Sequence, residues 1–136
     1  MSNAAIRAGL ENVLAAWAQA QAPPIPVAWQ NQAFTPPPAR YIRAFLLPGK
    51  TASYDMDGEQ RVFVGVWQVS LCMPLGSGSA DAQTLEAAIC ALYPKETPIT
   101  ASGVTTTLKS PMSAGPSIPN DTHYTVPISC SYQAFT

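Results

Sequence analysis

Charged side chains are scarce in this chain. Asp, Glu, Lys and Arg make up 11% of its 136 residues, against about 25% in an ordinary globular domain. Seven basic and eight acidic residues leave a net charge of −1, so no basic stripe is available for phosphates and nucleic-acid recognition is not expected. Because the chain is also 47% hydrophobic, we expect exposed neutral and apolar surface, which is typical of proteins that bind other subunits. A neutral skin of Ala, Ser, Thr and Gln is the alternative interpretation.

Long apolar runs, paired cysteines and clustered metal ligands are lacking too. No run of about 18 apolar residues predicts a transmembrane helix, and no basic amphipathic segment predicts binding to a membrane surface. The first apolar segment is interrupted by Arg7, Glu11 and Asn12, unlike a secretory signal. The cysteines are widely spaced and form no Cys-x-x-Cys or Cys/His cluster, so we expect buried free thiols in a cytoplasmic protein. They are Cys72, Cys90 and Cys130.

Motifs for catalysis or ligand binding are absent as well. His123 is the only histidine, and with Asp121 alone it indicates no triad, so we predict a surface or strand-end histidine. Residues 55–59 resemble a calcium loop only in part, because Val64 stands where the pattern needs an acidic residue. Residues 76–79, Gly-Ser-Gly-Ser, lack the lysine of a phosphate-binding loop. The sequence therefore gives no catalytic residue, metal ligand or cofactor, and we predict that the protein is not an enzyme.

Two segments have the apolar spacing of a helix. The first ends at Pro23 and Pro24, and the second is expected to begin after Ser79 and to end before Pro94. The first apolar stripe is Ile6, Leu10, Val13, Leu14 and Trp17, and the second is Leu85, Ala88, Ile89 and Leu92. Stripes of this kind usually pack on a sheet, so we expect both helices to cover one.

Five segments are predicted as strands. They are residues 25–31, 41–47, 61–73, 104–108 and 124–133. Proline in the first and last favours an edge position or a bulge, and the third alternates a bulky set with a mixed set, so its second face should be partly exposed or joined to a neighbour. The order α-β-β-β-α-β-β predicts an α+β fold, a single mixed, mainly antiparallel sheet of about five strands with two helices on one face. One domain should span residues 1–136.

Two long polar loops are the candidate contact segments. Residues 50–58 connect two strands of a predicted hairpin, and residues 110–120 are rich in proline. Long loops at sheet ends often reach partners, although both could be no more than mobile connections. The candidate subunit-interface residues are Lys50, Asp55, Asp57, Pro111, Pro116 and Pro119.

A series of short sequence blocks extends over nearly the whole chain. They are Trp17-Ala18, residues 24–31 (PIPVAWQN), 41–48 (YIRAFLLP), 73–78 (MPLGSG) and 124–129 (YTVPIS). In their order and spacing the blocks resemble the phage tail terminator-like family, which is similar to lambda-type tail terminators. The resemblance implies a ring, of six copies in the lambda type, that caps the tail tube. The implied partners are further copies, the tail tube protein and the head–tail connector protein, and the implied location is the phage virion tail. No catalytic or ligand-binding residue is implied.

The sequence leaves two other functions open. Another tail or neck subunit of a phage or prophage would differ from a terminator only in its partner and position. A small-molecule or peptide-binding module would use a pocket lined by Trp17, Trp29 and Trp67, although aromatic residues at such positions are more often part of the core.

Overall fold

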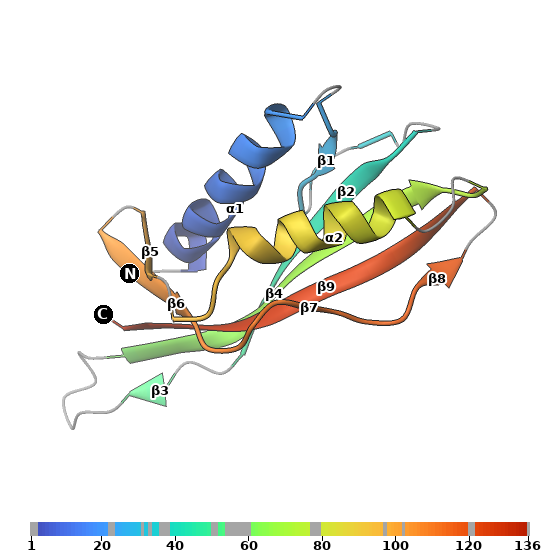
Figure 1. Cartoon of the computed structure of the whole chain (residues 1–136). Coiled ribbons are helices and arrows are strands. Elements are labelled where there is room, and N and C mark those ends of the chain that lie inside the picture. The colour runs from blue at the N-terminus through green and yellow to red at the C-terminus, as the bar shows by residue number, and fades with distance from the viewer. Residues whose placement is uncertain are drawn as a thin grey trace.

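The computed structural model shows two helices on one face of a curled, mixed sheet (Figure 1). It describes residues 3–21, 24–30, 32, 34–35, 39–49, 52–53, 61–76, 80–96, 98–101, 103–119 and 122–135. The helices are α1 (Asn3–Gln19) and α2 (Ala80–Leu92). The strands are β1 (Val27–Ala28), β2 (Tyr41–Pro48), β3 (Ala52–Ser53), β4 (Arg61–Pro74), β5 (Pro98–Ala101), β6 (Val104–Leu108), β7 (Ser113–Ala114), β8 (Ile118–Pro119) and β9 (His123–Phe135).

The long strands β2, β4 and β9 form the centre of the sheet. The strand order is β1-β2-β4-β9-β6-β5, with β3 also paired to β4 and with β7 and β8 also paired to β9. Only β1 runs parallel to its neighbour among the described strands. The predicted α+β class and mainly antiparallel sheet are confirmed, but about five strands is too low. The strands β3, β5, β7 and β8 are two to four residues long, too short for an apolar alternation to predict them.

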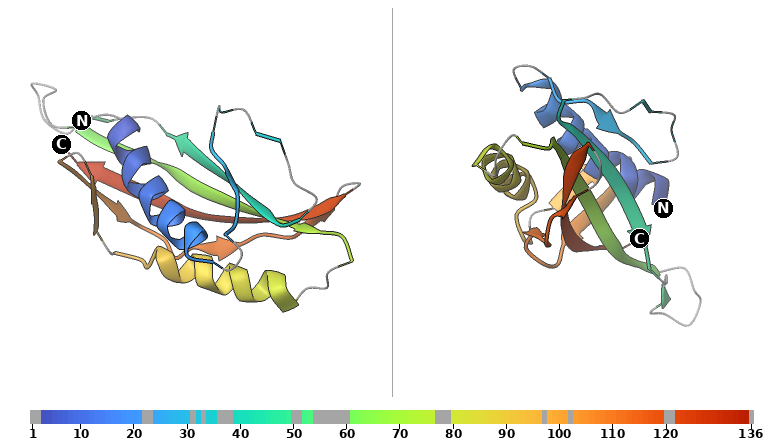
Figure 2. Two further views of the ribbon diagram at one scale, coloured as in Figure 1. Left: turned by 90° about the horizontal axis from the view of Figure 1, so that it is seen from above. Right: turned by 90° about the vertical axis from the view of Figure 1, so that its right-hand side faces the viewer.

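Both helices lie on the same face of the sheet, which we call the near face, as two further views show (Figure 2). The opposite face is the far face. In α1, the side chains of Ile6, Leu10 and Leu14 are completely buried, while Val13 and Trp17 lie half-buried at the margin of the stripe. The spacing of three to four residues that predicts this stripe also keeps its members on one side of the helix. The helix therefore packs as expected and contacts β2, β5 and β6.

The second helix has the expected ends. Asp81 is exposed in its first turn, where a carboxylate is stabilised by the positive end of the helix dipole. Pro94 follows Tyr93 directly after the last turn and cannot continue the helix. Ser79, the expected cap, lies outside the described residues. Ile89 is completely buried on the side that faces the sheet.

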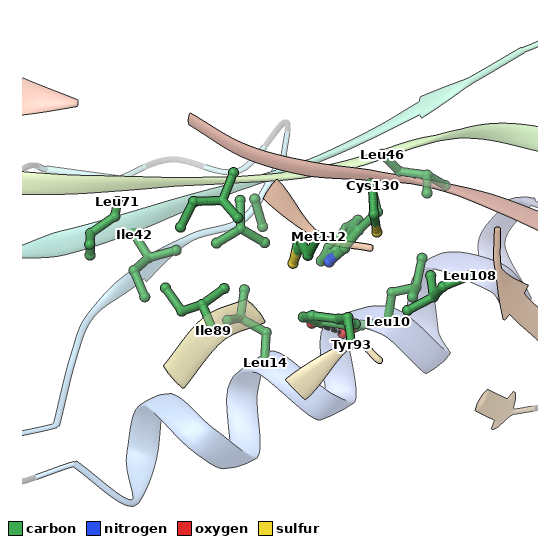
Figure 3. Close-up of a cluster of buried hydrophobic side chains, with 14 of the residues drawn as sticks. Leu10, Leu14, Ile42, Leu46, Leu71, Ile89, Tyr93, Leu108, Met112 and Cys130 are labelled. Carbon is green, nitrogen blue, oxygen red and sulfur yellow. Dashed lines mark hydrogen bonds between the residues drawn. The ribbon is translucent and has the colours of Figure 1, made fainter. Parts of the chain in front are cut away.

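The core lies between the helices and the near face. Figure 3 shows Leu10 of α1, Tyr93 after α2 and Cys130 of β9 pointing into the same layer. Trp67 of β4 is completely buried, with its ring centroid 6.2 Å from that of Tyr93. The hydroxyl of Tyr93 donates a hydrogen bond of 2.8 Å to the carbonyl of Leu10. This bond satisfies a buried phenol and links the end of α2 to α1.

The sequence predicts an edge position or a bulge for Pro127. It lies inside β9, which is a central strand, so the edge position is wrong. Its carbonyl accepts a hydrogen bond of 2.7 Å from the amide of Gly115, so its backbone faces away from β4. On that side β7 pairs with residues 128–129 and β8 with residues 124–125. The missing amide hydrogen of Pro127 therefore points between two short strands and removes no bond to β4.

A side chain closes the sheet edge next to β1. The predicted strand at residues 25–31 is an edge strand, but of its described residues, 25–30, only Val27–Ala28 form a strand that pairs with β2. Beyond β1, the side-chain oxygen of Gln30 accepts two hydrogen bonds, one of 2.9 Å from the backbone amide of Leu46 and one of 3.1 Å from the guanidinium of Arg7. Farther along β2, Pro48 has no amide hydrogen to offer. Such features protect an edge from pairing with a strand of another chain.

We predict that Gln30→Ala lowers the free energy of unfolding by about 1–2 kcal/mol, because it leaves the amide of Leu46 without its acceptor. Urea unfolding followed by circular dichroism measures the change. The exposed Gln32 provides the control, and Gln32→Ala should change stability by less than about 0.5 kcal/mol. Equal effects of the two substitutions would contradict the role given to Gln30.

Candidate functional site

The sheet face turned away from the helices is covered at one end. There the ring centroid of Tyr41 lies 5.5 Å from that of Phe34, and 5.1 Å from that of His123 in an edge-on arrangement. Nε2 of His123 lies 3.0 Å from the carbonyl oxygen of Ala39, and Nδ1 lies 2.9 Å from the hydroxyl of Thr122. Because a carbonyl can only accept, Nε2 is the nitrogen that donates. These contacts hold the chain before β2 against the far face.

The position of His123 is only partly as expected. His123 is the first residue of β9, so the predicted strand-end position is confirmed. Its side chain is only 4% exposed, so the predicted surface position is wrong. No local pattern predicts this burial, because the residues that cover His123 precede it by more than 80 positions. Asp121 lies outside the described residues.

No described segment of the chain covers the rest of the far face. We call this part the open face. Its apolar residues are Phe45, Leu47, Val62, Val64 and Val66, and its neutral polar residues are Gln68, Thr107, Ser129, Ser131 and Gln133. The pairing register places them together, since Leu47 lies opposite Val66 and Val66 opposite Ser131. This face is the mixed set of the predicted alternation in residues 61–73, and its partial exposure is confirmed at Val64 and Gln68.

Charges lie at the margins of the open face, among the side chains that the structure describes. Arg43 is exposed on β2, toward the covered end. On the other side, Lys109 follows β6 and its ammonium lies 3.2 Å from the carboxylate of Glu96. The open face is thus apolar along β2 and β4 and neutral polar along β9 and β6, with the described charges at its margins. Surfaces that combine apolar and neutral polar area, with charge kept to the rim, are common in protein–protein contacts.

The segment expected to be a free loop at residues 110–120 lies instead along β9. Ser113–Ala114 and Ile118–Pro119 pair with β9, and the side chain of Met112 is 7% exposed. The hydroxyl of Ser110 accepts a hydrogen bond of 2.9 Å from the amide of Ser131. The pairing of this proline-rich segment depends on β9, a strand elsewhere in the chain. It therefore leaves no periodic pattern in the sequence of the segment itself.

The structure describes half of the candidate interface residues. Pro111, Pro116 and Pro119 are exposed along the side of the sheet that β7 and β8 form. Lys50, Asp55 and Asp57 lie outside the described residues. The described neighbours of that arm are the β3 residues 52–53, which pair with the start of β4, at the opposite end of the sheet from β8 (Figure 1).

The pocket predicted from three tryptophans is not formed. Trp67 is completely buried and cannot line an open pocket. Trp29 lines a cavity of about 220 Å³ between the end of α1 and β1, and Trp17 is not among the residues that line it. A second cavity of about 190 Å³ lies between α2 and β9 and is lined in part by Glu86 and Tyr124. Both are smaller than the roughly 300–1,000 Å³ of typical ligand pockets.

Titratable groups are dispersed in the part of the chain that the structure describes. Burial raises the pKa of Glu11, an effect opposed by the nearby charge of Arg7, 3.9 Å away. Within the same described residues, no three His, Cys, Asp or Glu side chains lie close enough together to hold a metal ion. None of the described helices is long and apolar enough to cross a membrane. The arrangement offers contact surface and presents no assembled acid–base pair among these residues.

All three cysteines are free thiols, and we predict that Cys130 reacts last with a thiol reagent. Burial, and secondarily Cys90, raises the pKa of Cys130 from 9.0 to about 11, so the reactive thiolate is scarce at pH 8. Cys90 is only half-buried and should be labelled first, although burial raises its pKa too. Peptide mass spectrometry of the labelled, folded protein measures the order.

The same pKa predicts an alkaline loss of stability. A thiol whose pKa is raised on folding stabilises the folded state below the unfolded pKa, near 9.0, and this contribution is lost as the pH rises toward 11. The order of labelling and the alkaline loss of stability both depend on the burial of Cys130. If Cys130 is labelled as fast as Cys90 in the folded protein, that burial is contradicted.

Comparison with known proteins gives matches of two kinds, to a family model and to solved structures. A family model described as phage tail terminator protein matches residues 5–132, from the first turn of α1 to the last part of β9. Four chains of solved structures match. One of them is 41% identical and superimposes with a TM-score of 0.84 over 98% of this chain and 96% of its own length. No curated protein matches.

Proposed function

The chain belongs to the phage tail terminator family, and from this premise we propose that it caps the end of a phage tail tube and joins the tube to the head-side connector. The observation that carries the proposal is the family match over residues 5–132, which includes α2, β2 and β4 and most of α1 and β9. The family is one of structural proteins of the phage tail. The role of a cap, its partners and its place in the virion tail are the proposed extension.

A cap of this kind requires a closed ring of copies. In a ring, one surface of each copy binds a different surface of the next, and closure leaves no unpaired contact around the circle. We propose a ring of six copies, as in lambda-type terminators. One face of the ring would be complementary to the last tube subunits, and the other would not, so that no further tube subunit could add.

The described surface supports a role in assembly. Among the described residues, the open face is apolar along β2 and β4 and has charges only at its margins, and three exposed prolines follow the side formed by β7 and β8. Proline side chains are already restricted and lose little conformational entropy when a partner covers them. We propose that Pro111, Pro116 and Pro119, together with Lys50, Asp55 and Asp57 of the arm, contact neighbouring subunits.

Electron microscopy of the tail tube protein of the same phage tests the cap. The tube protein is polymerised alone, with this chain, and with an unrelated folded protein of similar size. Shorter tubes that carry extra density at one end are expected only with this chain. Unchanged tube lengths, with this chain absent from the ends, would reject the terminator function and favour another tail or neck subunit.

Shortening the arm tests the contact residues. When a short Gly-Ser turn replaces residues 50–58, we expect the chain to stay folded and to cap more weakly, because Lys50, Asp55, Asp57 and the two-residue strand β3 are lost while the pairing of β2 with β4 remains. Thermal unfolding and the tube-length assay measure the two effects. An unfolded variant would show that the arm is structural, and a folded variant with full capping would remove these residues from the contact.

A further inference from the structure

We propose that the cavity between α2 and β9 receives an arginine side chain of another protein of the phage tail, which pairs with the carboxylate of Glu86. The inference rests on the proposed function, because it names the chemistry of one contact through which the cap holds a neighbour. Three features carry it, namely the lining of the cavity, an unpaired carboxylate, and the exposed apolar side chains at the rim.

Segments far apart in the chain build the cavity. Its polar lining residues are Gln83 and Glu86 of α2, Ser117 of the segment between β7 and β8, and Tyr124 of β9. That segment runs along β9 on the same side as α2 (Figure 1). The volume of about 190 Å³ is well above the space that one water molecule needs and below the range of typical ligand pockets. A space of this size admits the end of one side chain.

Glu86 is the only charged residue among those that line the cavity. It is half-buried, and no described residue forms an ion pair or a hydrogen bond with its carboxylate. Glu11 and Glu96, by contrast, each face a basic side chain. Burial, and secondarily the charge of Glu86, raises the pKa of Cys90 one turn further along α2. A partly desolvated charge without a partner costs stability, so this carboxylate indicates a role outside the fold.

The lining favours a guanidinium over other groups. An anion would be repelled by Glu86, and a divalent metal ion needs several oxygen ligands, whereas no three potential ligands lie together among the described residues. A guanidinium offers a fork of donors that matches a carboxylate and a flat face that stacks on an aromatic ring. Glu86 and Tyr124 provide these two partners, and the side-chain oxygens of Gln83 and Ser117 are further acceptors.

The rim of the cavity is suited to contact with a protein. Ser117 is followed by Ile118, which at 61% is the most exposed large hydrophobic residue among those described. Pro116 and Pro119 on either side are exposed too, and both belong to the proposed contact residues. Apolar side chains around a polar contact exclude water from it and so strengthen it. The arginine is therefore expected on a partner protein rather than as a free small molecule.

A second copy of this chain is a poor source of the arginine. Among the described arginine side chains, Arg7 donates to Gln30 beneath α1, and Arg40 has an interaction within the chain. Arg43 is exposed, but it stands inside β2 on the far face. Its entry into a recess beside α2 would bring a whole sheet face against that helix. We therefore take another tail protein as the source.

Glu86→Gln tests the carboxylate in the full chain, because it removes the charge and keeps the size of the side chain. We expect an unchanged or higher melting temperature, since no described residue pairs with the carboxylate. Asp81→Asn removes the same charge from an exposed position in the first turn of α2 and is the control for net charge. A melting temperature that falls further for Glu86→Gln than for Asp81→Asn would give Glu86 a structural role and overturn the proposal.

Binding to the tail tube protein and to the head-side connector protein of the same phage is then measured over a range of salt concentrations. We expect wild type and Asp81→Asn to bind at least one of these proteins alike. Glu86→Gln should bind it about tenfold more weakly and with a shallower dependence on salt. Arginine-to-alanine substitutions in that partner locate the pair, because one of them should weaken binding of wild type and leave that of Glu86→Gln unchanged.

Three results overturn the proposal. Folded Glu86→Gln that binds both proteins as wild type does removes the cavity from the contact, and the terminator function survives if wild type still shortens tubes. A loss that is traced to no arginine of the partner rejects the proposed occupant. Weaker self-association of Glu86→Gln in sedimentation velocity, with unchanged binding to both proteins, makes a second copy the occupant. Wild type that binds neither protein and leaves tube lengths unchanged rejects the terminator function and this inference with it.

Discussion

Replacing Trp67 with alanine is expected to lower the free energy of unfolding by about 3–5 kcal/mol. The indole is completely buried between the sheet and the helices, beside the ring of Tyr93. Its removal takes away the burial of a large apolar surface and leaves a cavity that the surrounding strands cannot close. Because a chain of this size has a total stability of about 5–15 kcal/mol, the loss is a large fraction of what holds it folded.

Chemical denaturation measures this loss, provided that the slope of the transition stays the same. Trp67→Phe should cost less, about 1–2 kcal/mol, because it keeps a ring in the same space. Trp29→Ala is the comparison in a half-buried tryptophan, with a loss expected to be less than half that of Trp67→Ala. An unchanged melting temperature for Trp67→Ala would remove this residue from the core and make it a contact residue instead.

Gly65→Ala is expected to cost about 2–3 kcal/mol although it adds one carbon atom. A β-carbon at this position would lie 2.5 Å from the carbonyl oxygen of Leu47, and 2.6 Å from the hydroxyl oxygen of Tyr132. The first contact is with backbone in the adjacent strand and can be relieved only if β2 moves away from β4. The second is with a ring that packs across the glycine, since Gly65 and Tyr132 lie opposite each other.

Thermal and urea unfolding of Gly65→Ala, compared with Val64→Ala in the same strand, test this packing. Val64 is half-buried on the open face, so its truncation should cost about 1 kcal/mol or less. The glycine variant should therefore be the less stable of the two, against the general preference for alanine over glycine in strands. A Gly65→Ala variant as stable as wild type would mean that Tyr132 and β2 can shift without loss.

Periodic patterns predicted much of this fold. The stripe that includes Ile6 and Leu10 predicted a helix that packs on a sheet, and the alternation of residues 61–73 predicted a strand with one buried face. Trp67 lies on the buried face as that alternation requires. These predictions hold because a helix repeats every 3.6 residues and a strand every two, so burial on one side is recorded along the chain itself.

Short and irregular elements were not predictable in this way. The strands β5, β7 and β8 are two to four residues long, and each depends on a partner strand that lies elsewhere in the chain. The sequence predicts His123 at the surface or at a strand end, and only the structure shows that the carbonyl of Ala39 lies against its side chain. Pro127 reads as an edge residue until β7 and β8 are placed on either side of its missing amide.

The sequence by itself determined the α+β class, the long elements, the buried faces of α1 and β4, and the resemblance to phage tail terminators that the family match confirms. Each of these depends on local periodicity or on the order of sequence blocks. Only the tertiary structure decided which part of the far face is covered and which is open, and how the edges of the sheet are closed. Those features arise from contacts between residues far apart in the chain, such as Gln30 with Leu46 and Ala39 with His123, and no single segment records both partners.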